Sequence, residues 1–125
     1  MTRLDRDRPG AGPIVQAFSG TGFRVDGNIY PDGVKLTPRT ALPWQAPAIA
    51  ALAAADLVDL LALDPPPEFL LLGTGADMRR PSPAFAAAVE ALGFGIEAMD
   101  SKAAARAWNV LRGEDRWVVA ALMPL

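Results

Sequence analysis

The chain has 125 residues, of which 51% are hydrophobic and 21% charged, and its formal net charge is -2. This length and composition predict one globular domain, and the slight acidity, with no run of basic residues, argues against nucleic-acid binding. Because histidine and cysteine are both absent, the sequence lacks the commonest general base and the usual zinc ligands, and we expect neither catalysis nor a cofactor or metal site.

Residues 1–13 are predicted to form a flexible N-terminal arm, because alternating charges there are followed by glycine and proline. This segment lacks the apolar core of an export signal. The most apolar stretch, residues 46–63, is interrupted by Pro47, Asp56 and Asp59, whereas a membrane-spanning helix needs about 20 mostly apolar residues. We therefore expect a cytoplasmic protein without a transmembrane segment.

The first half of the chain predicts four short strands, at residues 14–18, 23–25, 28–30 and 34–37. Asp26 and Gly27 separate the second strand from the third. An Asp-Gly pair between two β-prone runs favours a two-residue hairpin turn, since glycine accepts positive φ at little cost. Prolines then interrupt the pattern as far as residue 52, where the one expected element is a short edge strand around Trp44.

The second half predicts a helix at 53–63, a strand at 68–72, a helix at 82–93, a strand at 94–99, a helix at 101–112 and a strand at 116–123. This alternation favours parallel strands with helices packed on the sheet. The hairpin region before it adds antiparallel strands, so we expect a mixed sheet. The last strand is strongly apolar, and we expect it at the centre of that sheet.

The expected helices carry caps and apolar faces that the spacing of their residues indicates. Helical spacing predicts two buried faces, one formed by Leu57, Leu60 and Leu61 and the other by Phe85, Val89 and Leu92. We expect Ser82 to cap the helix at 82–93, and Asp100 or Ser101 to cap the last helix.

The three tryptophans are expected mostly in the core. Trp108 and Trp117 fall on the last helix and the last strand, where large apolar side chains are usually buried. Trp44 follows the same expectation, but its proline-rich surroundings leave an alternative in which it is exposed and anchors a protein contact.

Several motifs of this chain occur together in a known family. They are Leu-Leu-Leu-Gly-Thr-Gly at 70–75, Met-Asp-Ser at 99–101, Ala-Ala-Arg-Ala-Trp-Asn-Val-Leu at 104–111, and Glu114 with Arg116 before the last strand. From about Ile14 onward the chain thereby resembles the adipogenesis-associated, Mth-like domain family. Departures from the family pattern are serine for threonine at Ser101, alanine for cysteine and threonine at Ala105 and Ala107, and tryptophan for tyrosine at Trp108.

The resemblance implies a single three-layer α/β domain over residues 14–125, with a central mixed β-sheet flanked by helices and an N-terminal β-hairpin region. It also implies a family without an established catalytic activity, whose relatives include a mitochondrial assembly factor for respiratory complex I. We therefore expect a non-catalytic protein-binding or assembly-factor-like domain. The sequence does not identify its protein partner or its oligomeric state. We expect any contact with a membrane complex to be peripheral.

The glycine-rich turn Gly73-Thr74-Gly75 is the first candidate binding site. Such a turn at the carboxyl end of a strand lies where open α/β sheets often bind ligands, and Arg79 with the next helix start could hold an anion. The alternative is a tight turn beside solvated arginines. Met78 stands where a dinucleotide fingerprint needs its third glycine. An anion or small-molecule site here, enzymatic or not, is the alternative function.

The last helix and the turn after it form the second candidate site. Arg106 and Asn109 share one helical face, where the arginine could pair with a carboxylate and the asparagine could bond loop backbone. Glu114 and Arg116 are the other polar positions that match the family. A structural role and an interface role are equally expected for these four residues.

Overall fold

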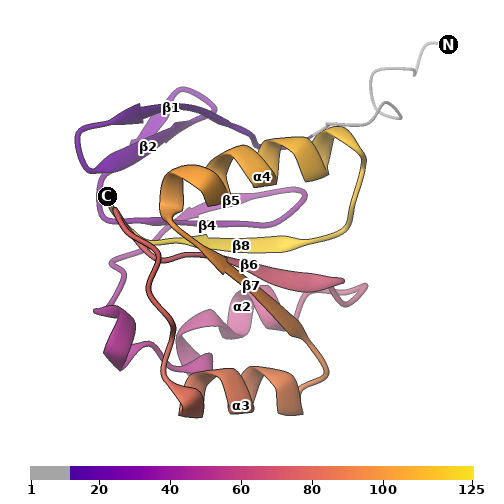
Figure 1. The fold of residues 1–125 in the computed structure, drawn as a ribbon. Coiled ribbons are helices and arrows are strands. Elements are labelled where there is room, and N and C mark those ends of the chain that lie inside the picture. The colour runs from indigo at the N-terminus through magenta and orange to yellow at the C-terminus, as the bar shows by residue number, and fades with distance from the viewer. Residues whose placement is uncertain (1–11) are drawn as a thin grey trace, which may run out of the picture.

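The computed structural model describes residues 12–125, so nearly all of the arm expected at residues 1–13 lies outside the described residues. Two sheets and three layers make up this part of the chain (Figure 1). Helix α4 (Ser101–Gly113) and a small antiparallel sheet cover one face of the central sheet. Helices α2 (Val58–Leu61) and α3 (Pro83–Ala91) cover the other face. The expected three-layer α/β fold with a central mixed sheet is therefore confirmed, although the first hairpin strands, expected in that sheet, form a separate small sheet.

The small sheet contains strands β1 (Val15–Ser19), β2 (Gly22–Val25) and β3 (Asn28–Tyr30). The predicted turn joins β2 to β3, with Asp26 at φ 51° and Gly27 at φ 82°, the positive values that a tight hairpin turn requires. Phe23 and Val25 are fully buried, whereas Arg24 between them is exposed. The alternation of apolar and polar residues thus determines which face of the hairpin packs into the core that it shares with α4.

The central sheet has the strand order β5-β4-β8-β6-β7. Its strands are β4 (Val34–Leu36), β5 (Ala41–Pro43), β6 (Phe69–Gly73), β7 (Gly95–Met99) and β8 (Val119–Leu122). Strand β8 runs parallel to β6 and antiparallel to β4, and β6 runs parallel to β7. The central place predicted for the last strand is confirmed, although the strand is four residues long and not eight.

Two apolar cores lie on opposite faces of this sheet. The core on the α4 side includes Phe23, Leu71 and Trp108, and the core on the other side includes Leu60, Leu70 and Phe85. Every residue of β8 is buried, because the strand contributes alternate side chains to both cores. A strand covered on both faces must be apolar throughout, and this requirement explains the unbroken apolar run near the end of the sequence.

Three local expectations need correction. The helix expected at 53–63 is a 3₁₀ turn, η2 (Ala54–Leu57), followed by a single α-helical turn, although its three leucines are buried as predicted. Leu92 is not buried but 59% exposed, because α3 ends at Ala91 and Leu92 is already its C-cap. The edge strand β5 pairs with β4 but ends before Trp44.

Candidate functional site

The turn after strand β6 holds its own polar groups. The Thr74 hydroxyl donates to the Asp77 carbonyl at 2.7 Å and accepts the Arg79 N–H at 3.0 Å. The Thr74 N–H donates to the Met99 carbonyl at 2.9 Å, which joins the turn to the end of β7. Thr74 is buried, and these bonds use its hydroxyl and N–H within the turn. Its hydrogen bonds therefore favour the tight-turn interpretation of this residue.

Ser101 locks the same turn to the start of helix α4. Its hydroxyl accepts the Gly75 N–H at 2.8 Å and donates to the Met123 carbonyl at 2.7 Å. Its own N–H donates to the Gly75 carbonyl at 2.8 Å. Asp100, not Ser101, is the N-cap of α4, since its carboxylate accepts the Ala103 N–H. From the sequence, Ser101 is expected only as an alternative cap, and its hydrogen bonds to the backbone of Gly75 and Met123 are not predicted.

A shallow hollow of about 410 Å³ lies beside Gly75. Its lining residues include Thr74, Gly75 and Arg79 from the turn, Pro47 and Ile49 from the chain before η2, and Pro124. Arg79 is exposed, whereas Arg106 does not line the hollow. The structure therefore brings Gly75, Thr74 and Arg79 together and leaves the residues of the second candidate site elsewhere.

Asn109 fastens helix α4 to the small sheet. Its side-chain amide donates to the Val15 carbonyl at 2.9 Å and accepts the Val15 N–H at 2.9 Å. The amide thus satisfies both backbone groups of one residue of β1, as a neighbouring strand would. Asn109 does bond backbone as the sequence suggested, but the backbone belongs to a strand and not to a loop. Arg106 is exposed, and among residues 12–125 it has no carboxylate within ion-pair distance.

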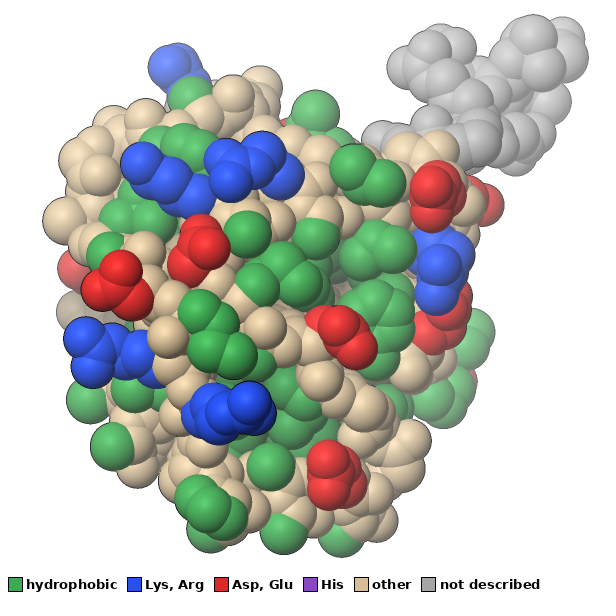
Figure 2. Space-filling view, viewed as in Figure 1, with side chains coloured by type: hydrophobic (Ala, Val, Ile, Leu, Met, Phe, Trp, Pro, Cys, Tyr) green, Lys and Arg blue, Asp and Glu red, His purple; other side chains and the backbone are tan. Residues whose placement is uncertain are grey.

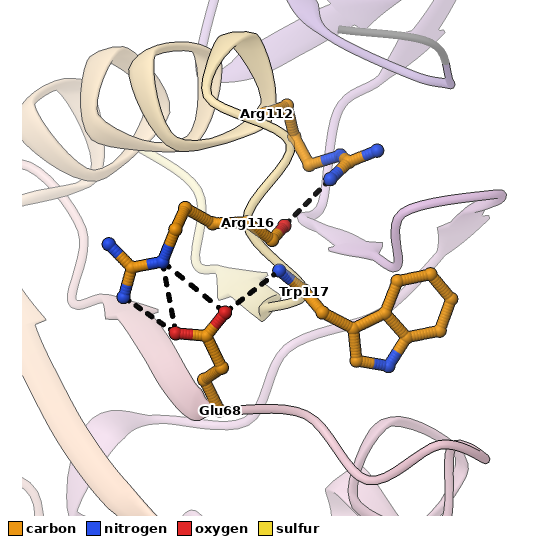
Figure 3. Close-up of polar contacts among 4 residues, drawn as sticks. All are labelled: Glu68, Arg112, Arg116 and Trp117. Atoms are coloured by element: carbon orange, nitrogen blue, oxygen red, sulfur yellow. Dashed lines mark hydrogen bonds and ion pairs between the residues drawn. The ribbon is translucent and has the colours of Figure 1, made fainter. Parts of the chain in front are cut away.

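Arg116 pairs with Glu68 across the starts of strands β8 and β6 (Figure 3). The Arg116 Nη2 lies 2.6 Å from the Glu68 Oε1, and the other carboxylate oxygen accepts the Trp117 N–H at 3.1 Å. The hydrogen bond from Arg116 lowers the pKa of Glu68, and the same bond raises the pKa of Arg116. Both side chains are more than 40% exposed, so solvent weakens the pair.

Arg112, in the last turn of α4, bonds the backbone of the segment that leads to β8. It is 4% exposed, and its Nη1 donates to the Arg116 carbonyl at 2.6 Å (Figure 3). Its Nη2 lies 3.8 Å from the Asp115 carboxylate. A cation at the C-terminal end of a helix is favourably placed for the helix dipole. Glu114 is exposed at the C-cap of α4, so the four polar positions expected as one cluster are separated.

Sequence reasoning missed Glu68 and Arg112 as members of this network. A signal for Glu68 existed, because it precedes one parallel strand and Arg116 precedes another. Neighbouring parallel strands start at the same end of a sheet, so the pairing of β6 with β8 brings the two charges together. No comparable signal marks Arg112, since basic residues occur near the ends of many helices, where they favour the last carbonyls and the helix dipole.

The tryptophans divide between the core and the surface. Trp108 is fully buried, as predicted, and its indole N–H donates to the Pro13 carbonyl at 2.9 Å. Trp117 lies outside both cores and is partly exposed, so the core prediction is wrong for this residue. Its indole N–H bonds the Pro65 carbonyl, and Arg39 lies 5.0 Å from its ring centroid. Trp44 is partly buried against the α2–α3 core.

Across residues 12–125, no helix has the length and hydrophobicity that crossing a bilayer requires.

Fold and turn geometry together define a single three-layer α/β domain of mixed sheet, and comparisons with known proteins give its family. Residues 15–123 match the model of the family described as "Protein of unknown function (DUF498/DUF598)". A solved structure from Bordetella parapertussis covers 92% of this chain and 98% of its own, at 33% identity with a TM-score of 0.82. A Mth938-like domain from Bordetella pertussis covers 90% and 85%, at 28% identity with a TM-score of 0.76. The chain belongs to this Mth-like family.

A relative with a named role comes from Danio rerio. It is NADH dehydrogenase [ubiquinone] 1 alpha subcomplex assembly factor 3, and it is 29% identical over 114 residues. The match covers 91% of this chain and 66% of the relative. This chain therefore spans slightly less than two thirds of that assembly factor.

Proposed function

We propose that this chain is a non-catalytic protein-binding domain that acts as an assembly factor for a membrane respiratory complex, which it contacts from the cytoplasmic side. The observation that carries the proposal is its similarity to the complex I assembly factor of Danio rerio over 91% of the chain. The shared segment is nearly the whole of this chain. The function of that segment in the assembly factor is therefore the best guide to the function of this chain.

Three side chains at positions of the family motifs support the same conclusion. Ser101 and Asn109 direct their polar atoms to backbone groups inside the protein, and Arg116 directs its guanidinium to Glu68. These contacts maintain the fold and engage the three side chains within the protein, whereas Arg106 and Glu114 are exposed at the surface, where a partner can reach them. Because a fold by itself does not determine function, the proposal rests on these exposed positions and on the similarity to the assembly factor.

A small-molecule or anion site beside Gly75 is the second candidate. The hollow of about 410 Å³ has Arg79 at its rim, and a guanidinium is a suitable donor for a phosphate or carboxylate. The hydrogen bonds of Thr74 to Asp77 and Arg79 weigh against it, because they leave the threonine hydroxyl no free donor. Titration calorimetry with inorganic phosphate, on wild type and Arg79→Ala, tests this candidate directly.

Affinity purification tests the proposed function. The tagged full chain is expressed in the organism that encodes it, and bound proteins are quantified by mass spectrometry with and without solubilised membranes. We expect subunits of a respiratory complex to be enriched over a tagged unrelated protein. Enrichment of no specific protein under either condition contradicts the proposal, as does turnover by the purified chain that one acidic or basic substitution abolishes.

A further inference from the structure

Strand β7 is an edge of the central sheet. It pairs with β6 on one side, and no strand among residues 12–125 pairs with it on the other. In Figure 1 it is the strand nearest the viewer, between helix α4 above and helix α3 below. An edge strand presents backbone N–H and C=O groups that another chain can pair with.

The backbone directions along β7 identify those groups. The Met99 carbonyl accepts the Thr74 N–H at 2.9 Å, so the backbone of Met99 points towards β6. Because the backbone groups of successive residues in a strand point to opposite sides, those of Ile96 and Ala98 point to the open edge. Two residues therefore offer two donors and two acceptors to an added strand.

An apolar groove opens along the same edge. Its volume is about 390 Å³, and it is lined by Phe69 and Leu71 of β6, Glu97 and Met99 of β7, and Ala107, Val110 and Leu111 of α4. Val110, in this lining, is a large apolar side chain that is 60% exposed. Figure 2 shows hydrophobic side chains gathered on this face between α4 and β7, with an acidic side chain among them. A strand added beside β7 would place alternate side chains in this groove.

The negative charge of Glu97 in the groove indicates which kind of strand can bind there. Glu97 is exposed and occupies the middle position of β7. Residues 81–101, which include α3 and β7, contain no lysine or arginine. A second copy that paired through its own β7 would therefore bring Glu97, and no basic side chain of that strand, to this edge. Opposite charges across neighbouring strands are favourable and like charges are not, so the groove fits a strand with a basic residue between apolar ones.

We infer that the β7 edge binds an extended segment of a different protein, which adds as a strand and places a lysine or arginine opposite Glu97. Main-chain hydrogen bonds supply affinity in this mode of recognition, and pockets for alternate side chains supply specificity. The inference rests on the proposed protein-binding function and names the surface that performs it.

A model strand tests this assignment. The probe is the capped peptide Thr-Val-Thr-Lys-Thr-Val-Thr, compared with the same peptide carrying glutamate at its centre, and the reporter is the ¹⁵N-labelled full chain observed by NMR. The lysine peptide should shift the amide signals of Ile96 and Ala98 and bind at least about fivefold more tightly than the glutamate peptide. In Glu97→Lys the preference should reverse.

Matched variants separate groove binding from general loss of structure. Val110→Asp should abolish peptide binding, whereas Val58→Asp should not, because Val58 is equally exposed at 63% but lies on the opposite face of the sheet. Ala98→Pro removes only an outward N–H and should also weaken binding. If either Ala98→Pro or Val110→Asp fails to fold, the Glu97→Lys variant still tests whether the β7 edge binds the peptide.

The inference is overturned if neither peptide perturbs Ile96 or Ala98 at about 1 mM, or if both peptides bind equally well. It is also overturned if the free chain dimerises and Val110→Asp abolishes the dimer, since the edge then belongs to a second copy. If wild type and Val110→Asp capture respiratory subunits equally and neither peptide binds, the inference about the β7 edge is overturned and the proposed function is supported. Selective peptide binding without any captured subunit supports the edge and contradicts the proposed function.

Discussion

Gly73 and Ser101 are in contact across the junction of strand β6 and helix α4. A β carbon on Gly73 would lie 2.8 Å from the Ser101 hydroxyl oxygen and 2.9 Å from the Leu122 Cδ2. The hydroxyl cannot swing away without breaking its bonds to Gly75 and Met123. The glycine thus allows the serine to reach the backbone of both neighbouring segments, and its role in the motif is close packing.

Gly73→Ala should lower the free energy of unfolding by about 2 kcal/mol, because the added methyl group overpacks a buried junction. Ser101→Ala should cost about 2 kcal/mol, since the Gly75 N–H loses its only described side-chain partner. Urea denaturation of both variants and of the double variant measures the coupling. We expect the double variant to be about 1 kcal/mol less destabilised than the sum; strict additivity contradicts the contact.

The sequence specifies this fold through a few strong local signals. The Asp26-Gly27 turn, the Ser82 cap and the unbroken apolar run of β8 each have one favourable structural solution. Leu92 shows where such reasoning fails, because helical spacing does not reveal that α3 ends one residue earlier. Gly93 has φ 95° and ends the helix, which leaves Leu92 at an exposed cap although its spacing is right.

Asn109→Asp should destabilise the chain by about 1–2 kcal/mol, because a carboxylate cannot donate to the Val15 carbonyl. Arg106→Ala on the same helix is the control and should change stability by less than about 0.5 kcal/mol, since Arg106 is exposed. Thermal and urea unfolding measure both variants.

The Arg106→Ala variant also tests the role of this arginine. If the variant retains its melting temperature and loses partner binding, the arginine serves an interface; simple unfolding would assign it a structural role.

Trp108→Phe should destabilise the chain by about 2–4 kcal/mol. The substitution leaves the Pro13 carbonyl without the indole donor and opens a cavity in the α4 core. Trp117→Phe is a matched control, because Trp117 lies outside both cores and its bond to Pro65 is exposed. Equal loss of stability in the two variants, measured in urea, would contradict the distinction between them.

The Glu68–Arg116 pair predicts a small pH dependence of stability. The hydrogen bond from Arg116 holds the pKa of Glu68 below its ordinary value of 4.5. The pair therefore contributes its full stability above about pH 4.5 and loses it as pH falls through the lowered pKa. Wild type should exceed Glu68→Gln in stability at pH 6, and the difference should shrink towards pH 3. An undiminished difference at pH 3 contradicts the pairing. Added salt should reduce the stability difference between wild type and Glu68→Gln at pH 6.

The candidate sites were less predictable than the fold, for a physical reason. Single polar residues such as Asn109 and Arg116 are suited equally to structural and binding roles, and only their neighbours decide between them. Those neighbours, Val15 and Glu68, are 94 and 48 residues away in the chain. The groove beside β7 has no sequence motif at all, since it exists only where α4 extends over the edge of the sheet.

The most direct test of the assembly role is the state of the respiratory complex in a strain that lacks this chain. Membranes from the deletion strain, and from strains complemented with wild type or with Val110→Asp, are separated by blue native electrophoresis and stained for NADH dehydrogenase activity. We expect the deletion strain to lose the full complex and to accumulate smaller subcomplexes, and only wild type to restore the complex. A full complex of normal amount in the deletion strain would contradict the assembly role.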